Sequence, residues 1–348
     1  QRQMCIRDRV LVEETTFDPV ALLTLFIKRS LATLNMQVSL NRAEVFMFTV
    51  EELTPRMVEV LGKVVSGLQL KCPQICFQSH IESFYYYMLH QQAELWKREV
   101  FVFEYNDTLK TLRFQCNRHT TPRVVFIEHL DYPEMKRVDW AEDEAQRMAQ
   151  QQELDAQFGQ LCESCLHETD VSTVFLIGEG FKEGWTRESL KILCHNRRVF
   201  QGNNLYSKGA CYAGMEKLNP QESTREYVYL GEDKLKSNIG MRALRRGEDS
   251  YLAILDAGVN WYEAKTDFDL ILESGNVLCF TITPLTGENI MDKTVTLDGL
   301  PERPRCTTRL RIHAEMTAIH TLTLEITDMG FGELFKSSGR AWTHTLQV

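Results

Sequence analysis

The chain has 348 residues, of which 43% are hydrophobic and 25% are charged, and its formal net charge is −9. These values are typical of a globular protein long enough for about two domains. Lys and Arg form no dense cluster, which argues against nucleic acid as a partner. The longest apolar run, residues 20–27, is much shorter than the roughly 20 residues that cross a bilayer, so we expect no membrane partner. Ten cysteines at scattered spacings favour the reducing cytoplasm over a disulfide framework.

Residues 1–9 do not begin with Met and share no periodicity with the chain that follows. We expect them to be a non-native leader, with the natural chain beginning further upstream.

The first half of the chain alternates between helical and strand patterns. Thr54 is predicted to cap a helix, because it directly precedes Pro55 and a helical stripe. Residues 99–105 and 109–116 predict a β-hairpin. The predicted helices span 19–34, 55–68, 80–96 and a polar segment within 139–167, and the predicted strands span 44–50, 70–78, 99–105, 109–116 and 123–129.

Residues 173–215 carry the most informative pattern. The apolar, β-branched run 173–177 predicts a strand buried on both faces. Gly178 and Gly180 allow a tight turn, and a helix over 188–194 and a strand over 197–200 follow. A last helix, predicted to start near Asn203, contains small residues that permit close approach of another backbone or a flat ligand.

This order of elements resembles the adenosine-binding segment of the actin and Hsp70 ATPase superfamily. The resemblance implies that Gly178, Glu179 and Gly180 meet the nucleoside, and that Lys208 and Gly209 lie on the helix behind it. A plain strand-turn-helix of an α/β protein remains the alternative, because a single GxG is a weak signal.

The resemblance extends upstream, where Glu82 opens the segment that corresponds to the connecting helix of the first ATPase lobe. The hairpin then stands where the superfamily has its second phosphate-binding loop. The superfamily's loop is rich in glycine, whereas here the side chains of Tyr105 and Thr108 would crowd a phosphate. The degenerate loop consists of Glu104, Asn106, Asp107 and Thr108. Its acids would repel a phosphate unless Mg²⁺ intervened, and an ordinary surface β-turn is the alternative.

The C-terminal third contains short alternating runs separated by turn signals, which predicts an antiparallel β-sandwich over residues 222–348. The predicted strands span 251–255, 269–272, 277–283, 294–297, 308–313 and 321–327. This segment resembles the substrate-binding domain of Hsp70, for example in the sequence VTLDGLP at residues 295–301. Two interpretations stay open: a peptide-binding groove, or a generic β-sandwich interaction module.

No catalytic residue and no metal site is predicted. Cys162 and Cys165 form a CxxC pair followed by His167. Zinc would need further ligands at close spacing, so two cysteines on a polar helix are the simpler interpretation.

Together these patterns predict an α/β actin-like ATPase (ribonuclease H-like) fold over residues 10–218, incomplete at its N-terminus and comprising the end of lobe one and most of lobe two, followed by the all-β sandwich. The resemblance implies a cytoplasmic, chaperone-like clamp from an uncharacterised bacterial branch of Hsp70-like proteins, which binds a protein or peptide through the β domain. ATP or ADP with Mg²⁺ is the implied cofactor. The alternative is a non-hydrolysing scaffold that keeps the fold without ATPase activity. Hydrolysis by this chain is not expected, because the superfamily's first phosphate loop would lie upstream of these residues, in the part that we expect to be missing.

Overall fold

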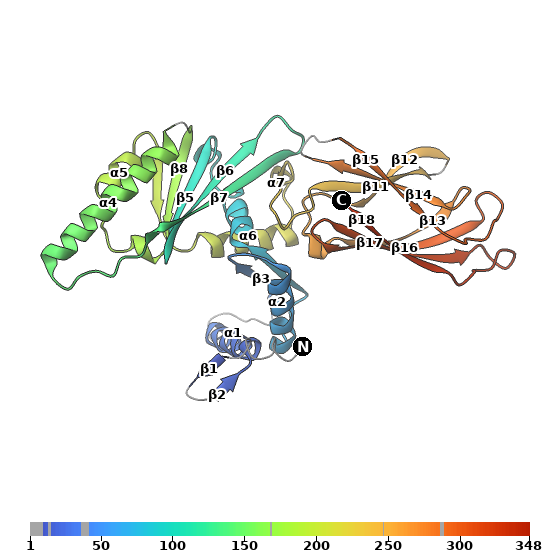
Figure 1. Ribbon diagram of the computed structural model, residues 1–348, viewed down its shortest axis with the longest axis horizontal. Coiled ribbons are helices and arrows are strands. Elements are labelled where there is room, and N and C mark those ends of the chain that lie inside the picture. Colours follow the sequence, from blue (N-terminus) through green and yellow to red (C-terminus); the bar gives the residue numbers. More distant parts are fainter. Residues whose placement is uncertain (1–9, 13–14, 36–41, 168, 246, 286–288) are drawn as a thin grey trace. The chain divides into compact units, whose positions relative to one another are not determined.

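The computed structural model describes residues 10–12, 15–35, 42–167, 169–245, 247–285 and 289–348, so the expected leader lies outside the described residues. The chain divides into two compact units, residues 1–228 and 229–348 (Figure 1). The division falls after the boundary expected near residue 220. The reason is that α7 (Glu222–Arg225) and β10 (Tyr227–Tyr229) follow that point, and β10 completes the sheet of the first unit.

The first unit begins with an antiparallel pair of short strands, β1 (Val10–Val12) and β2 (Thr15–Phe17), followed by α1 (Pro19–Asn35). Two parallel strands, β3 (Val45–Val50) and β4 (Gln74–Ser79), are joined through α2 (Pro55–Leu68). The predicted cap of α2 is confirmed, because the Thr54 hydroxyl accepts a hydrogen bond of 3.2 Å from the Met57 N–H. The strand predicted from residue 70 begins only at Gln74, directly after Pro73, which has no N–H for a ladder.

A six-stranded sheet forms the centre of the first unit, with the order β10-β7-β6-β5-β8-β9. Its remaining strands are β5 (Glu99–Tyr105), β6 (Thr108–Asn117), β7 (Arg123–Lys136), β8 (Val171–Ile177) and β9 (Arg198–Gln201). β5, β6 and β7 form an antiparallel meander, which confirms the predicted hairpin. β8 and β9 continue the sheet in parallel beyond β5. Every residue of β8 is buried, as its sequence predicts.

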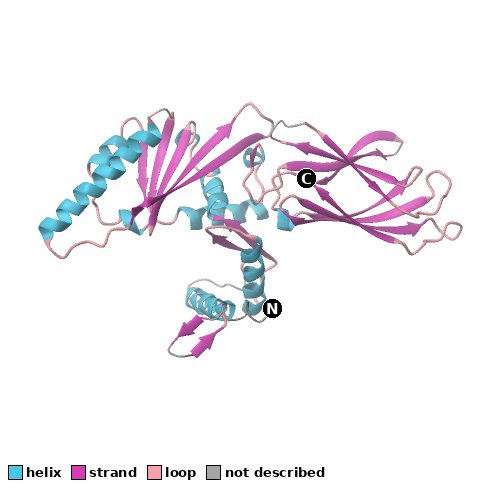
Figure 2. Ribbon diagram, in the orientation of Figure 1, coloured by secondary structure: helices cyan, strands magenta, loops and turns pink. Residues whose placement is uncertain are grey.

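Helices cover both faces of this sheet (Figure 2). On one face lie α4 (Glu144–Leu166) and α5 (Glu188–Leu193), where Phe158 and Cys162 of α4 join the core. The polar helix expected within 139–167 is therefore present and has a buried side. The other face is covered by α3 (His80–Leu89) and α6 (Leu205–Leu218). Phe84 of α3 contacts Phe114, with ring centroids 5.8 Å apart.

The helix expected over residues 80–96 is shorter than predicted. It ends at Leu89, where the N–H of His90 bonds the carbonyl of Met88, and only a short 3₁₀ helix, Ala93–Leu95, follows. The apolar residues up to residue 96 continue the helical pattern, but Leu95 and Trp96 are buried outside the helix.

The second unit consists of two four-stranded antiparallel sheets around one hydrophobic core. One sheet has the order β12-β11-β14-β15, with β11 (Ser237–Arg245), β12 (Glu248–Leu255), β14 (Val277–Pro284) and β15 (Met291–Thr296). The other has the order β13-β16-β17-β18, with β13 (Lys265–Leu272), β16 (Thr308–Ala318), β17 (Thr321–Gly330) and β18 (Ala341–Gln347). Alternate residues of β17, such as Leu322, Leu324 and Ile326, are fully buried.

A buried ion pair fixes the loop between β17 and β18. The Asp328 side chain is 0% exposed and that of Arg303 is 6% exposed, and two hydrogen bonds of 2.8 Å join them. Asp328 also accepts from the N–H groups of Gly330 and Ser338, at 2.9 and 2.8 Å. The hydrogen bonds from Arg303 hold the pKa of Asp328 far below its usual range. This pair therefore anchors the start of the last strand.

Candidate functional site

The predicted nucleoside turn and the predicted phosphate hairpin meet in the structure. β5 and β8 are parallel neighbours, so their C-terminal ends lie side by side. The side-chain oxygen of Asn106, in the hairpin turn, accepts a hydrogen bond of 3.2 Å from the N–H of Glu179. Asn203, just before α6, accepts one of 3.2 Å from the N–H of Gly178. We call the group of residues around these contacts the hairpin cluster. It consists of Glu104, Asn106, Gly178, Glu179, Asn203 and Tyr206.

The two glycines of the turn are needed because Tyr105 lies against them. Gly178 has φ = +103°, and a Cβ added there would lie 2.4 Å from the carbonyl oxygen of Tyr105. A Cβ on Gly180 would lie 2.4 Å from the ring of the same tyrosine. Tyr105 is 1% exposed, and its hydroxyl donates to the Lys136 carbonyl at 2.7 Å. The space that these glycines leave open is therefore occupied by Tyr105, through its carbonyl group at Gly178 and its ring at Gly180.

The carboxylate of Glu104 is hydrogen-bonded through both of its oxygens. One oxygen accepts from the side-chain amide of Asn106 at 3.0 Å, and the other accepts from the hydroxyl of Tyr206 at 2.6 Å. The Tyr206 ring stacks on His80, with centroids 4.2 Å apart. Burial, together with the charge of Glu104, raises the pKa of Tyr206 far above its usual range, so its hydroxyl stays protonated and donates. A cation that bound Glu104 would have to share both carboxylate oxygens with these donors.

The charged residues beside the hairpin are paired as well. Lys110 of β6 donates a hydrogen bond to Glu51, which follows β3. This hydrogen bond lowers the pKa of the Glu51 carboxyl and raises that of the Lys110 amine. Burial lowers the pKa of His80, which favours its neutral form. The charge of Lys110, a lysine on the strand that leaves the hairpin turn, is thus paired with a carboxylate.

The other residues predicted for a nucleotide site do not join the hairpin cluster. Lys208 is exposed in the first turn of α6. Gly209 is buried between helices, since an added Cβ would lie 1.8 Å from the Ser83 carbonyl oxygen in α3. Its small size serves the packing of α6 on α3. Glu82 is buried in the first turn of α3, where its N–H bonds the Ser79 hydroxyl at 3.1 Å.

The rest of the hairpin turn has a structural role. Asp107 is exposed, and its carbonyl accepts a hydrogen bond of 2.8 Å from the N–H of Arg137. Thr108 is half-buried at the start of β6, opposite Lys136. The turn is therefore held by β7 in addition to the glycine turn.

The CxxC pair lies on α4. Cys162 is in the core, where burial raises the pKa of its thiol, and the Cys165 sulfur lies 3.4 Å from the Tyr132 hydroxyl. Within the described ranges, no three His, Cys, Asp or Glu side chains are arranged to hold a metal ion.

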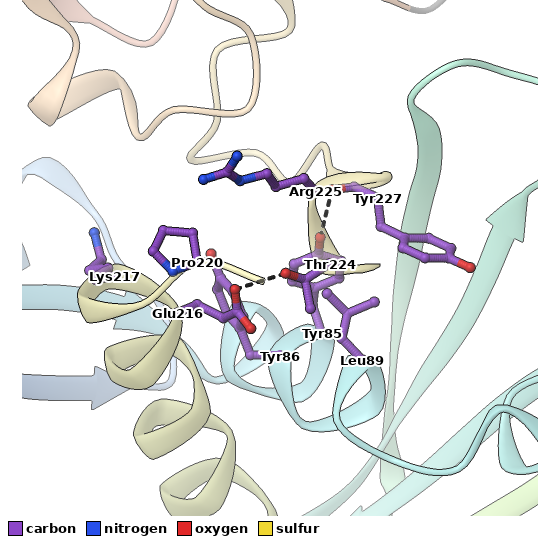
Figure 3. A pocket seen from close by; sticks show the side chains of 9 residues that line it. All are labelled: Tyr85, Tyr86, Leu89, Glu216, Lys217, Pro220, Thr224, Arg225 and Tyr227. Atoms are coloured by element: carbon purple, nitrogen blue, oxygen red, sulfur yellow. Dashed lines mark hydrogen bonds between the residues drawn. The ribbon is translucent and has the colours of Figure 1, made fainter. Parts of the chain in front are cut away.

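A pocket that sequence reasoning missed lies at the C-terminal ends of α3 and α6, with a volume of about 260 Å³ (Figure 3). Its lining residues are Tyr85, Tyr86, Leu89, Glu216, Lys217, Pro220, Thr224, Arg225 and Tyr227. Glu216 forms an ion pair of 3.1 Å with His90 and accepts a hydrogen bond of 2.8 Å from Thr224. The acid in this pocket therefore already has partners. No sequence signal marked it, since three separate helices supply most of its wall.

The residues that complete the hairpin cluster, Asn203 and Tyr206, were also missed. Asn203 marked only the start of a helix in the sequence, and nothing in the pattern around residue 206 indicates a partner about 100 residues earlier.

Among the described residues, no helix combines the length and the hydrophobicity needed to cross a bilayer. Comparison with curated proteins gives no match. Residues 234–348 match a domain of unknown function, DUF8552. Residues 2–232 match the C-terminal model of a family of unknown function, DUF5716. The limit between the two matches lies within a few residues of the division between the two compact units. Because the DUF5716 match covers more than half of the chain, the chain belongs to the DUF5716 family.

Proposed function

We propose that this chain is a protein-binding module on an actin-like, Hsp70-like framework, and that it does not hydrolyse nucleotide. The observation that carries the proposal is the closed hairpin cluster. Tyr105 packs against Gly178 and Gly180, and Glu104 is hydrogen-bonded through both oxygens to Asn106 and Tyr206. A phosphate loop works by leaving backbone N–H groups free for the ligand. Here the N–H groups of Gly178 and Glu179 are bonded to asparagine side chains.

The order of the central sheet supports the actin-like framework. An antiparallel meander, β5 to β7, is extended at β5 by two parallel strands. α4 leads from β7 to β8, and α5 leads from β8 to β9. The glycine turn follows β8, and α5, β9 and α6 come after it, which is the order of elements in the segment that residues 173–215 resemble.

The second unit supports a role in protein binding. Its two sheets enclose one core and turn alternate side chains outward, and no group of His, Cys, Asp and Glu among its described residues is arranged to hold a metal ion. We propose a protein or peptide as its partner and the cytoplasm as its location. The structure describes nine cysteines and no disulfide between any two of them, in keeping with a reducing compartment.

A second candidate function is a chaperone-like clamp that binds ATP or ADP with Mg²⁺. The observation in its favour is that the hairpin and the glycine turn, about 70 residues apart in sequence, are hydrogen-bonded to each other at the C-terminal edge of the sheet. That is the arrangement that the resemblance implies. The side chains there would have to exchange their internal hydrogen bonds for the ligand.

Calorimetry separates the two functions. Mg·ATP and Mg·ADP are titrated into the chain up to millimolar concentration, and phosphate release is followed in parallel. We expect no saturable heat and no turnover. Saturable binding that weakens in Asn106→Ala, but not in the exposed control Asp107→Asn of the same turn, would support the clamp. Turnover above background would contradict our proposal outright.

A further inference from the structure

The last strand of the second unit, β18, lies at the edge of its sheet and pairs only with β17 among the described strands. The Asp328 N–H bonds the Arg340 carbonyl at 3.1 Å, and the Val348 N–H bonds the His320 carbonyl at 3.0 Å. In an antiparallel ladder the bonded residues alternate. The even-numbered residues of β18 therefore bond β17, and the odd-numbered ones direct their N–H and C=O groups outward. The outward positions are Ala341, Thr343, Thr345 and Gln347.

This edge lacks the features that normally protect a sheet edge from another strand. β18 has the sequence AWTHTLQ, with no charged residue and no proline, and its seven pairs with β17 run without a register shift. The other three edge strands of the second unit carry charges, as the sequences KTDFDLIL of β13, EDSYLAIL of β12 and MDKTVT of β15 show. Natural proteins usually block free edges with charges, prolines or bulges. β18 is thus open to strand addition.

The inner side of β18 is also incompletely covered. Trp342, His344 and Leu346 point toward the core but stay half-buried. Their cross-strand partners on β17, Ile326, Leu324 and Leu322, are 0% exposed. The Nε2 atom of His344 is buried and has no hydrogen-bond partner among the described residues. A strand added beside β18 would extend the core over these three side chains.

We propose that a second copy of this chain fills the edge, pairing β18 with β18 in antiparallel orientation about a twofold axis. The strand is complementary to itself when His344 lies opposite His344 of the second copy. Thr343 then faces Thr345, and Ala341 faces Gln347, so that all outward groups are paired. On the inner side Trp342 meets Leu346 of the second copy, and each His344 gains an imidazole neighbour.

The observations favour a second copy over an unrelated peptide. In a second copy, the same uncharged strand supplies outward backbone groups for hydrogen bonds along the whole edge. It also supplies Leu346 as an apolar partner for Trp342 and a second imidazole as a partner for His344. The proposal does not depend on the proposed function, because it uses only the second unit. It joins two four-stranded sheets into one of eight strands through an isologous contact.

The test uses the full chain in sedimentation equilibrium over a range of concentrations. We expect a monomer–dimer equilibrium. In the double variant Thr343→Lys with Thr345→Lys, lysine faces lysine twice across the axis, and dimerisation should weaken about tenfold or more. Thr343→Lys with Thr345→Glu places opposite charges across the axis and should restore dimerisation.

The control is the double variant Thr323→Lys with Thr327→Lys on β17. It adds two charges to the same face of the sheet, but one strand away from the edge. It should leave the dimer unchanged. Thr345→Pro removes an outward N–H without removing a bond to β17, and it should abolish the dimer while circular dichroism stays that of a folded chain. A wild-type chain that is still monomeric at about 100 µM, roughly a hundred times a dissociation constant of about 1 µM, would overturn the proposal. A lysine–glutamate variant that does not regain dimerisation would overturn it as well. So would a monomer that captures an extended peptide along β18.

Discussion

The hairpin cluster of the first unit and the β18 edge of the second unit differ in where their hydrogen-bonding groups find partners. In the hairpin cluster, side chains of the protein form hydrogen bonds with the N–H groups of Gly178 and Glu179 and with both oxygens of the Glu104 carboxylate. Along β18, four residues direct their backbone groups outward, with no partner strand among the described residues. The comparison teaches that a site expected from family resemblance can be closed by contacts of the protein's own side chains. It also shows that a strand with no recognisable motif can remain open for association.

The largest expected effect concerns the anchor of β18. Asp328→Asn removes one charge of a buried pair and leaves Arg303 uncompensated. We expect the second unit to lose about 3–5 kcal/mol of stability in urea unfolding. The control is Asp269→Asn, which removes a partner of Arg311 in a pair exposed by 38% and 55%. That change should cost no more than about 1 kcal/mol. Equal effects of the two variants would contradict the role of Asp328 as the anchor.

A smaller effect is expected in the hairpin cluster. Tyr206→Phe removes the hydroxyl that donates to Glu104 at 2.6 Å while keeping the ring that stacks on His80. We expect a loss of about 1.5–3 kcal/mol in the first unit, because the hydrogen bond is partly buried and its acceptor is charged. Tyr212→Phe, which keeps the corresponding stack on His90, is the matched control. If the two variants unfold at the same temperature, the cluster does not hold the hairpin closed.

The packing of α6 behind the cluster gives the next prediction. Gly209→Ala places a Cβ 1.8 Å from the Ser83 carbonyl oxygen, so that α3 and α6 must separate. Overpacking of this kind costs about 1–3 kcal/mol. Gly62→Ala in α2 meets no atom within 4 Å and should be neutral or stabilising by up to about 1 kcal/mol. Thermal unfolding of the two variants compares them directly, and a neutral Gly209→Ala would refute the packing role.

Acid should weaken the β18 anchor gradually. The pKa of Asp328 is lowered in the folded state, chiefly by hydrogen bonds from Arg303. Its contribution is therefore fully present above the unfolded pKa of about 3.9. It is lost, by at most about 1.4 kcal/mol per pH unit, as the pH falls toward the folded value. The stability difference between wild type and Asp328→Asn should be constant from pH 7 to 5 and shrink below pH 4. A difference that shrinks already at pH 6 would point to another group.

The elements of the first unit could be predicted where residues alternate clearly, as in the hairpin that contains Glu104. The glycine turn was located correctly because a buried strand precedes it. Its surroundings were not predictable, because Tyr105, Asn203 and Tyr206 reach it through contacts between distant parts of the chain. For the small residues of α6 the sequence left two uses open, close approach of another backbone or of a flat ligand, and the structure places Gly209 against the backbone of α3.

In the second unit, β11 and β18 were missed although the other long strands were recognised. Both strands mix polar and apolar residues on their inner side, as His344 between Trp342 and Leu346 illustrates. The period-2 signal is therefore weak, and only the pairing with a neighbouring strand defines them. The same lack of a clear signal hid the most open edge of the unit.

Hydrogen exchange of the hairpin cluster tests the central claim most directly. The amides of Asp107, Gly178 and Glu179 are followed with and without millimolar Mg·ATP. The closed cluster predicts that their exchange rates do not change, because no backbone group of the turn is released to a ligand. Protection of these amides that rises and saturates with ATP concentration would show that nucleotide occupies the site, and would contradict the account.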